Sequence, residues 1–419
     1  MTLPVNCNYS CNICAGEEDV MEAGKLTAIV TDVKYRMTPA IIRDLGEAGV
    51  RVIACHTETE DNSPPLGYYS KHTAVRQTLP ADGYGDALYD LCRNITDNEG
   101  RRPALLPVGA ATLAKLTAPE TGAGFPQVCG LCIPTREQLG LLNDKGRIAA
   151  LAASLDVPVP ASYTPDESEQ IEKFYKRIPL PCVVKPRWGE GLGLTAALRY
   201  TIARTPEELR ESFCSFSEMA GEYPIVQEYL PGAGTGCSVF AQEGKIVSSI
   251  CHKRIREYPV TGGPSTCCEA VHDPRLVEWC GILAEAVGLT GPAMFEFKAN
   301  ADGKPRLLEV NPRIWGSYPL TRVAKTGFTY TWFAASWNKG NPDTPIPAPV
   351  ETEYRQRRMV FFPSDFAAAS GYLRVKKAKL TRGAIIDLLR PGVKDGLFEW
   401  GDARPALRYW RSLLRRASH

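Results

Sequence analysis

Three features are missing from this sequence: a long apolar run, an export signal and an excess of charge of one sign. No run approaches the ~18 apolar residues of a membrane span, so no transmembrane helix is expected. The N-terminus has no basic region followed by an apolar core, which argues against a secretory signal. The net charge of +2 favours neither nucleic acid nor a membrane surface as a partner. We therefore expect a cytoplasmic protein.

Internal repeats and low-complexity blocks are absent as well. Of the 419 residues, 44% are hydrophobic and 23% are charged, which is ordinary for a globular protein. At ~100–200 residues per domain, this length predicts two to four domains.

Cysteine, in contrast, is abundant for a chain without an export signal, with 14 residues. In a reducing compartment most of them should be small buried thiols. Cys7, Cys11 and Cys14 are closely spaced, and with Cys129 and Cys132 they could bind Zn²⁺ or an iron–sulfur cluster. The preferred interpretation is an N-terminal extension over 1–23 that carries free thiols.

Residues 24–140 alternate between strand and helix patterns. "LTAIVTDVKYRM" is followed by "TPAIIRDLGEAG", which has a helix start at Thr38–Pro39 and an end at Gly49, and then by the β-branched "VRVIACHTE". "YGDALYDLCRNI" and "PALLPVG" repeat the alternation. This pattern predicts a parallel α/β domain.

Beyond residue 140 the pattern changes to α+β. A helix is expected over "TREQLGLLNDKGRIAALAASL", and hairpins over "CSVFAQEGKIVSSICHK" and "GPAMFEFKANADGKPRLLEVNP". A proline-rich segment after about residue 340 leads into a small basic C-terminal domain, 341–419. Its final helix has a basic stripe, which could contact an acidic partner or a second copy of the chain, but a solvated helix face is the preferred interpretation.

The second hairpin carries a pattern that suits a metal. Side chains alternate faces along a strand, so Glu309 and Asn311 lie on one face, and pairing of the two arms can add Glu296. Two carboxylates and an amide oxygen suit Mg²⁺ that bridges nucleotide phosphates. Arg313 follows closely. The alternative is an exposed polar sheet face.

A lysine and a glycine-rich turn form a second candidate. Lys185 ends the apolar strand "VVK", and Gly189, Gly191 and Gly193 follow it. Backbone N–H groups of such a turn can approach phosphate, and the lysine adds positive charge. Taken alone, a flexible loop beside a solvated lysine fits as well.

The order of these motifs resembles the ATP-grasp superfamily, most closely the carbamoyl-phosphate-synthase-like carboxylate–amine ligases. The resemblance covers roughly 140–335 through "NDK", "VVKP", the glycine turn, "VQEYLPG", "FEF" and "LEVNPR". It implies an ATP-grasp domain over 141–340 that follows a pre-ATP-grasp α/β domain over 24–140. It also implies ATP and Mg²⁺ (or Mn²⁺) as ligands.

The resemblance assigns roles residue by residue. Lys145 and Lys185 match phosphate-binding lysines, and the three glycines match the loop that closes over the phosphates. Glu228, Tyr229 and Leu230 match the adenine-binding hinge. Glu296, Glu309 and Asn311 match the metal ligands, and Arg313 matches the arginine beside the transferred phosphoryl group. The acidic ribose contact of many members is missing, because Gly236, Cys237 and Ser238 occupy that region.

For the substrate carboxylate we predict Arg254 and Arg256, which alternate with Ile255 and so share one strand face. Together they could hold a carboxylate, with Arg254 also acting in catalysis. A solvated basic edge strand is the alternative. Gly262, Gly263 and Ser265 could form a backbone anion site close by, and Ser317 could line the same pocket.

The resemblance therefore implies an ATP-dependent ligase that activates a small-molecule carboxylate as an acylphosphate and joins it to an amine. An alternative is a bicarbonate-using carboxylase or carbamoyl-phosphate-type enzyme, although no glutaminase domain or biotin-carrier motif is visible. A nucleotide-sensing metal–sulfur regulatory protein is the third hypothesis. The expected partners are small molecules and no nucleic acid or membrane, with a homodimer left open.

Overall fold

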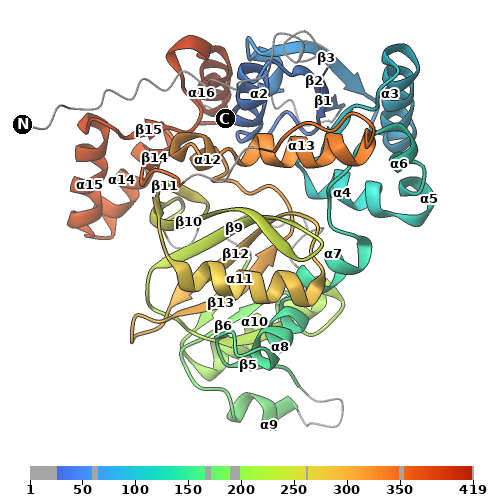
Figure 1. The fold of residues 1–419 in the computed structure, drawn as a ribbon. Helices are drawn as coiled ribbons and strands as arrows, with labels where there is room; N and C mark the ends of the chain where they lie inside the picture. The colour runs from blue at the N-terminus through green and yellow to red at the C-terminus, as the bar shows by residue number, and fades with distance from the viewer. Residues whose placement is uncertain are drawn as a thin grey trace, which may run out of the picture.

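The computed structural model describes residues 26–58, 65–165, 171–188, 199–260, 263–348 and 353–417. Their strands form three sheets, and Figure 1 shows these as an upper parallel layer, a central mixed sheet and a smaller lower sheet. The predictions for Cys7, Cys11, Cys14, Gly189, Gly191, Gly193 and Gly262 lie outside the described residues.

The first sheet confirms the predicted parallel α/β fold. Its four strands pair in parallel in the order β3-β2-β1-β4. Their bounds are β1 (Thr27–Val30), β2 (Arg51–Thr57), β3 (Thr73–Leu79) and β4 (Ala104–Leu106). The helices that follow these strands are α2 (Thr38–Glu47), α3 (Tyr84–Glu99), α4 (Ala110–Thr117), α5 (Pro119–Gly122) and α6 (Phe125–Val128).

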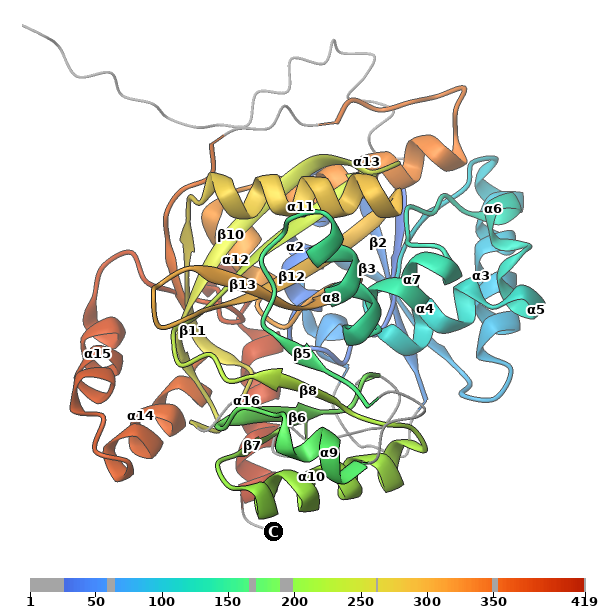
Figure 2. The same cartoon turned by 90° about the horizontal axis from the view of Figure 1, so that it is seen from below.

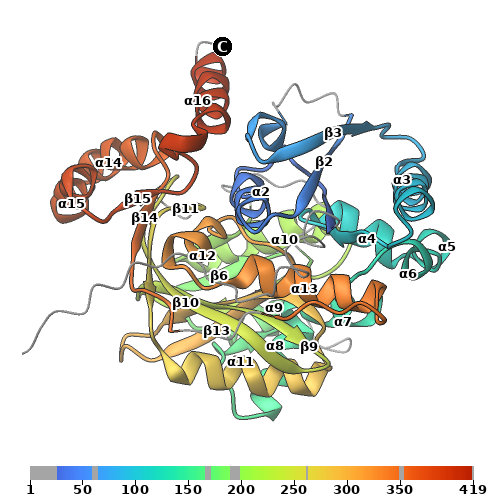
Figure 3. The same ribbon diagram turned by 45° about the horizontal axis from the view of Figure 1, so that its top comes forward.

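Both faces of this sheet are covered, as its nearly continuous apolar strands require. Ile29 and Ile53 belong to a core that α3 and α6 complete. Their neighbours Ala28 and Val52 point to the opposite face, into a core shared with α2 and with α13 (Phe328–Gly340). Figure 3 shows α13 between the parallel sheet and the central sheet, so this core joins the two layers.

The central sheet has seven strands in the order β13-β12-β9-β10-β11-β14-β15. Its strands are β9 (Gly234–Gln242), β10 (Lys245–Glu257), β11 (Ser265–Val271), β12 (Gly291–Ala299), β13 (Pro305–Asn311), β14 (Arg358–Val360) and β15 (Lys394–Asp395). Both predicted hairpins, β9–β10 and β12–β13, are confirmed. Helix α11 (Pro274–Val287) covers one face, and α12 (Pro319–Ala324) and α13 lie on the other.

The third sheet is small, with the order β5-β8-β6-β7. It consists of β5 (Ser162–Tyr163), β6 (Cys182–Lys185), β7 (Thr201–Ala203) and β8 (Ile225–Glu228). Figure 2 shows α9 (Ile171–Lys176) and α10 (Pro206–Ala220) against its outer side, where Phe174, Phe213 and Phe216 are buried.

The single helix predicted over the "TREQLGLLNDKGRIAALAASL" stretch is wrong, because the chain forms two. Helix α7 (Arg136–Leu142) ends before Asn143, and α8 (Lys145–Ser154) starts anew. The break has a local cause: the Asp144 side chain accepts hydrogen bonds from the backbone N–H groups of Gly146 and Arg147. An aspartate with this geometry caps a helix N-terminus rather than continuing a helix.

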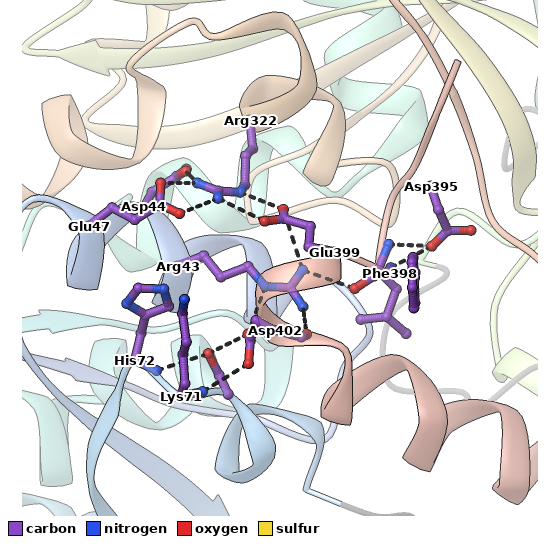
Figure 4. Close-up of polar contacts among 12 residues, drawn as sticks. Arg43, Asp44, Glu47, Lys71, His72, Arg322, Asp395, Phe398, Glu399 and Asp402 are labelled. Carbon is purple, nitrogen blue, oxygen red and sulfur yellow. Dashed lines mark hydrogen bonds and ion pairs between the residues drawn. The ribbon is translucent and has the colours of Figure 1, made fainter. Parts of the chain in front are cut away.

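The C-terminal segment is tied to the rest of the molecule by ion pairs. It contains α14 (Ser364–Arg374), α15 (Ala378–Leu389) and α16 (Arg404–Ala417), and its strand β14 pairs with β11 in the central sheet. Figure 4 shows Arg43 of α2 bound to Asp402 at 2.8 Å, and Arg322 of α12 between Glu47 and Glu399. These ion pairs join three regions that are far apart in sequence. The domain boundary near residue 340 stays a prediction.

Among the described residues, no helix has both the length and the apolar composition needed to cross a membrane.

Candidate active site

The β12–β13 hairpin places the predicted metal ligands side by side. Glu296 is the direct cross-strand partner of Glu309, and Met294 pairs with Asn311. The next pair is Phe297 with Leu307, so the register skips Leu308. Such a bulge re-aims the chain locally, and the carbonyl oxygen of Leu308 accepts a hydrogen bond from Lys185 Nζ at 3.3 Å.

The predicted cations converge on these oxygen atoms. Arg254 donates to Glu296 Oε2 at 2.8 Å, and Lys145 Nζ lies 3.6 Å from Glu309 Oε2. Arg313 donates to the amide oxygen of Asn311 at 3.2 Å. Strand β10, helix α8 and the turn after β13 therefore bring their basic groups to one surface of the hairpin, where Lys185 of β6 joins them.

Two residues that the sequence reasoning missed hold the lysines in place. Arg187, just after β6, donates to Asp144 Oδ2 at 2.8 Å, and its carbonyl oxygen accepts from the Lys145 N–H at 3.3 Å. The start of α8 is thereby attached to the end of the strand that carries Lys185. The Asp in "NDKGR" was a readable helix-cap signal, but its pairing with Arg187 depends on tertiary contact.

Burial and the neighbouring charges shift the pKa values in this cluster. Burial lowers the pKa of Lys185 to about 8, against the opposing effect of Glu309. Burial alone would raise the pKa of the Glu309 carboxyl, but Lys145 and Lys185 overcome it and lower that pKa to about 2. Burial raises the pKa of Glu296, which Arg254 opposes. Glu309 therefore remains an anion able to bind a cation at neutral pH.

The predicted hinge residues lie at the junction of the small and central sheets. Glu228 ends β8, and its carboxylate accepts from Arg306 of β13 at 3.1 Å and from the Ala161 N–H at 3.3 Å. The ring centroid of Tyr229 lies 5.5 Å from Lys298 Nζ. Leu230 is buried. The segment thus connects the sheet that bears Lys185 to the hairpin that bears Glu309, and its contact with adenine stays a prediction.

The prediction that Arg254 and Arg256 act together on a substrate carboxylate is wrong for Arg256. The strand register shifts between these two residues, so they do not share a regular face. Arg256 is 2% exposed, and its guanidinium binds Asp365 of α14 at 2.8 Å and Asp387 of α15 at 2.9 Å. Its donors are committed to the C-terminal helices, whereas Arg254 faces Glu296.

The other predicted substrate residues are spread along neighbouring loops. Ser265 is buried, and its hydroxyl donates to the Cys267 carbonyl at 3.0 Å, inside β11. Gly263 lies two residues before β11, and an added Cβ there would sit 2.2 Å from the Tyr258 carbonyl oxygen. Ser317 is buried just before α12. Their contact with a substrate stays a prediction.

The cysteines form no recognisable metal site among the described residues, in which no group of three or more His, Cys, Asp or Glu side chains could hold a metal ion. Cys129 and Cys132 are buried free thiols. The Cys129 thiol donates to the Phe125 carbonyl at 3.3 Å, and the carbonyl oxygen of Cys132 accepts from the Trp332 indole. Both residues therefore serve packing between α6, the following loop and α13.

Four basic side chains thus face two carboxylates, with an amide oxygen beside them. The excess of positive charge suits a polyanion, and the paired carboxylates suit a hard cation that bridges its oxygens. This combination can hold a nucleoside triphosphate with a divalent metal and offset charge that develops during phosphoryl transfer.

The fold is the ATP-grasp fold, as its structural neighbours show. Biotin carboxylase from Campylobacter jejuni, in a complex with β,γ-ATP, has a TM-score of 0.59 at 15% identity and covers 80% of this chain and 75% of that one. The N5-carboxyaminoimidazole synthetase from Staphylococcus aureus, in a complex with ADP, has a TM-score of 0.55 at 13% identity and covers 80% and 82%.

The chain carries an ATP-grasp domain. Residues 222–359 match the family described as "ATP-grasp in the biosynthetic pathway with Ter operon". The chain is also similar to the C-terminal section of the carbamoyl phosphate synthase large chain of Methanopyrus kandleri, with 23% identity over 241 residues. That match covers 55% of this chain and 43% of the relative, so the chain spans less than half of its relative's length.

Proposed function

We propose that this protein is an ATP-dependent carboxylate–amine ligase that releases ADP. The observation that carries the proposal is the cross-strand pair of Glu296 and Glu309, surrounded by the side chains of Lys145, Lys185 and Arg254. Two carboxylates side by side in a partly buried cluster of cations are typical of a functional site that binds a ligand or a metal.

The residues present fit Mg²⁺ or Mn²⁺. Glu296, Glu309 and Asn311 offer three oxygen donors from one hairpin, which is the ligand chemistry that a hard divalent cation prefers. When bound, the ion would supply positive charge that offsets the charge of the phosphate oxygens. Arg254 and Lys145 now neutralise the carboxylates, and with a metal bound they would be free to turn toward the phosphates.

The chain's own residues would perform three tasks. Lys145 and Lys185 would bind the triphosphate, and Arg313 would offset charge on the transferred phosphoryl group. A carboxylate oxygen would attack the terminal phosphorus, releasing ADP and forming an acylphosphate. An amine nitrogen would then attack the acyl carbon, lose a proton and expel phosphate. Phosphate is a far better leaving group than carboxylate oxygen, so phosphorylation of the carboxylate by ATP makes amide formation feasible.

The alternative is a carbamoyl-phosphate-type enzyme that activates bicarbonate, and the match to a carbamoyl phosphate synthase keeps it open. Similarity at this level does not select between bicarbonate and an organic acid, since fold and function separate readily. The third hypothesis, a nucleotide sensor, does not account for the full set of cations around Glu296 and Glu309. The free thiols among the described residues support a reducing, cytoplasmic setting for either enzyme.

The test is ADP and phosphate release with Mg·ATP across a panel of amino acids, dipeptides, simple carboxylates and bicarbonate, with mass spectrometry of the products. Glu309→Gln removes one metal-binding charge, and Glu285→Gln on the exposed side of α11 is the matched control. ADP release that needs a carboxylate and an amine, yields an amide and is lost only in Glu309→Gln would support the ligase.

Other results would contradict the ligase in distinguishable ways. Release with bicarbonate alone would select the carboxylase-type alternative. Tight ATP binding without release in any combination would select the sensor. Equal rates in Glu309→Gln and Glu285→Gln would mean that the β12–β13 hairpin is not the active site.

A further inference from the structure

A small cavity lies in the parallel domain, at the carboxyl ends of its strands. It has a volume of about 120 Å³ and is lined from the loop after β1, the end of β2 and the start of α4. The chain passes from β1 to β2 on one side and later returns to β4 on the other side of β1. Open parallel sheets bind ligands at such a reversal of strand order, outside the carboxyl ends.

The cavity has a rigid wall built around Asp32. Its carboxylate accepts from the Gly109 N–H at 2.8 Å and from the Thr112 hydroxyl at 2.9 Å. Asp32 has a φ of 56°, which few residues other than glycine adopt without such anchoring. A Cβ on Gly109 would lie 2.6 Å from the Asp32 carboxylate. These contacts fix the loop after β1 against the first turn of α4.

Basic groups also line the cavity. Within the described residues, neither Lys34 nor Lys115 forms an ion pair with a carboxylate, and the Lys115 ammonium lies 4.7 Å from the centroid of the Tyr84 ring. Nδ1 of His56 is buried and has no hydrogen-bond partner. Burial, aided by the charge of Lys34, lowers the pKa of His56, so its imidazole is neutral and keeps one N–H to donate.

The loop after β1 also contacts the central sheet and the turn before α12. Arg36, two residues beyond Lys34, donates to the Ser265 carbonyl at 3.2 Å in the central sheet. The Arg36 guanidinium also lies 3.7 Å from where a Cβ on Gly316 would be. One short loop therefore lines the cavity and contacts two of the segments predicted to bind substrate.

We propose that this cavity binds an anionic group of a small-molecule substrate, a carboxylate or a phosphate, through Lys34, Lys115 and the His56 imidazole. The donors are cationic or neutral N–H groups, the space admits one small group, and Asp32 is already engaged with Gly109 and Thr112. This proposal rests on the proposed ligase activity. The anionic group would belong to the same substrate molecule whose reacting group lies at the ATP site.

The first experiment follows the His56 ring by NMR on the full chain with labelled histidine, its signal assigned through His56→Asn. Inorganic phosphate and acetate are titrated as probes, in separate arms that distinguish the two anions. We expect a saturable shift of the His56 signal with at least one probe. Binding should weaken roughly tenfold or more in Lys34→Met and in Lys115→Met, since each removes a charge-assisted contact.

Two further variants serve as controls. Lys115→Arg keeps the charge and should retain most of the binding. Lys379→Met removes an exposed lysine from α15 and should bind the probes as the unaltered chain does. A His56 signal that neither probe moves, or equal affinities in Lys115→Met and Lys379→Met, would overturn the proposal.

A second measurement separates this proposal from the ligase. In the ADP-release assay, Lys115→Met should raise KM for an anion-bearing substrate roughly tenfold while kcat changes little. If no substrate pair supports turnover but the His56 shift still depends on the lysines, the cavity is an anion site and the ligase fails. Normal KM values for all anionic substrates in Lys115→Met would remove the cavity from substrate binding while leaving the ligase intact.

Discussion

Replacing Arg256 tests whether this buried arginine serves stability rather than substrate binding. Its guanidinium makes hydrogen bonds of 2.9, 3.2 and 2.8 Å to Asp365 and an ion pair of 2.9 Å to Asp387. The side chains of Asp365 and Asp387 are both 2% exposed. Burial tends to lower the pKa of Arg256, but the hydrogen bonds to Asp365 raise it above its ordinary value.

Arg256→Met should destabilise the protein by about 3–5 kcal/mol, the usual cost of leaving a buried charge without its partner. The loss falls mainly on Asp365, whose other side-chain donor is the Thr266 hydroxyl at 2.9 Å. Asp387 keeps Arg358 at 2.8 Å. The assay is urea and thermal unfolding followed by circular dichroism, with the unaltered chain measured in parallel.

Two companion variants sharpen the interpretation. Arg256→Met combined with Asp365→Leu should recover much of the lost stability, because an apolar pair replaces an ion pair at little net cost. Arg254→Met removes a cation that is 28% exposed, so it should cost less stability than Arg256→Met, whereas ADP release should be lost. Unchanged stability in Arg256→Met with a raised KM for the carboxylate would refute this reasoning and restore Arg256 to the substrate site.

Three further predictions follow from the site and the packing. Glu309→Gln should lower the rate of Mg-dependent ADP release by roughly 10²–10³, the usual effect of losing one group that stabilises transition-state charge, and Mn²⁺ titration should show weaker metal binding. Because the pKa of Lys185 is lowered to about 8, its charge is present below that pH and lost above it, so Kd for ATP should rise above about pH 8, with no such rise in Lys185→Arg. Stability should change in the opposite direction: the unfolded chain holds the Lys185 proton more tightly, so this group adds stability as pH rises from about 8 toward 10.5. Gly130→Ala should destabilise the fold by roughly 1–3 kcal/mol, since a Cβ would lie 1.8 Å from the Ser336 carbonyl oxygen of α13. Gly140→Ala in α7, where a Cβ meets nothing within 4 Å, should instead stabilise it by about 0.5–1 kcal/mol, and unfolding curves of the two variants decide the matter.

Local patterns in the sequence were sufficient for the elements that carry the site. Period-two alternation and the turn "NADGKP" predicted the β12–β13 hairpin, and the structure pairs Glu296 with Glu309 as that pattern requires. The strand before Lys185 and the parallel domain could be predicted for the same reason, because apolar runs between turn signals are local properties of the sequence.

Contacts between segments that are distant in the sequence could not be predicted from it. Alternation placed Arg254 and Arg256 on one face, but a register shift in β10 and two aspartates from the C-terminal helices send Arg256 elsewhere. The bulge at Leu308, which presents its carbonyl oxygen to Lys185, is likewise a matter of strand pairing.

The sequence by itself therefore determined which side chains are available for metal and phosphate and on which strands they lie, since neighbouring residues set strand periodicity and turns. Tertiary structure alone decided which charges meet. Lys34, His56 and Lys115 come from three separate segments, and only the strand order of the parallel sheet brings them to one cavity. Charge pairing depends on positions in space, and strand register and helix packing set those positions over the whole fold.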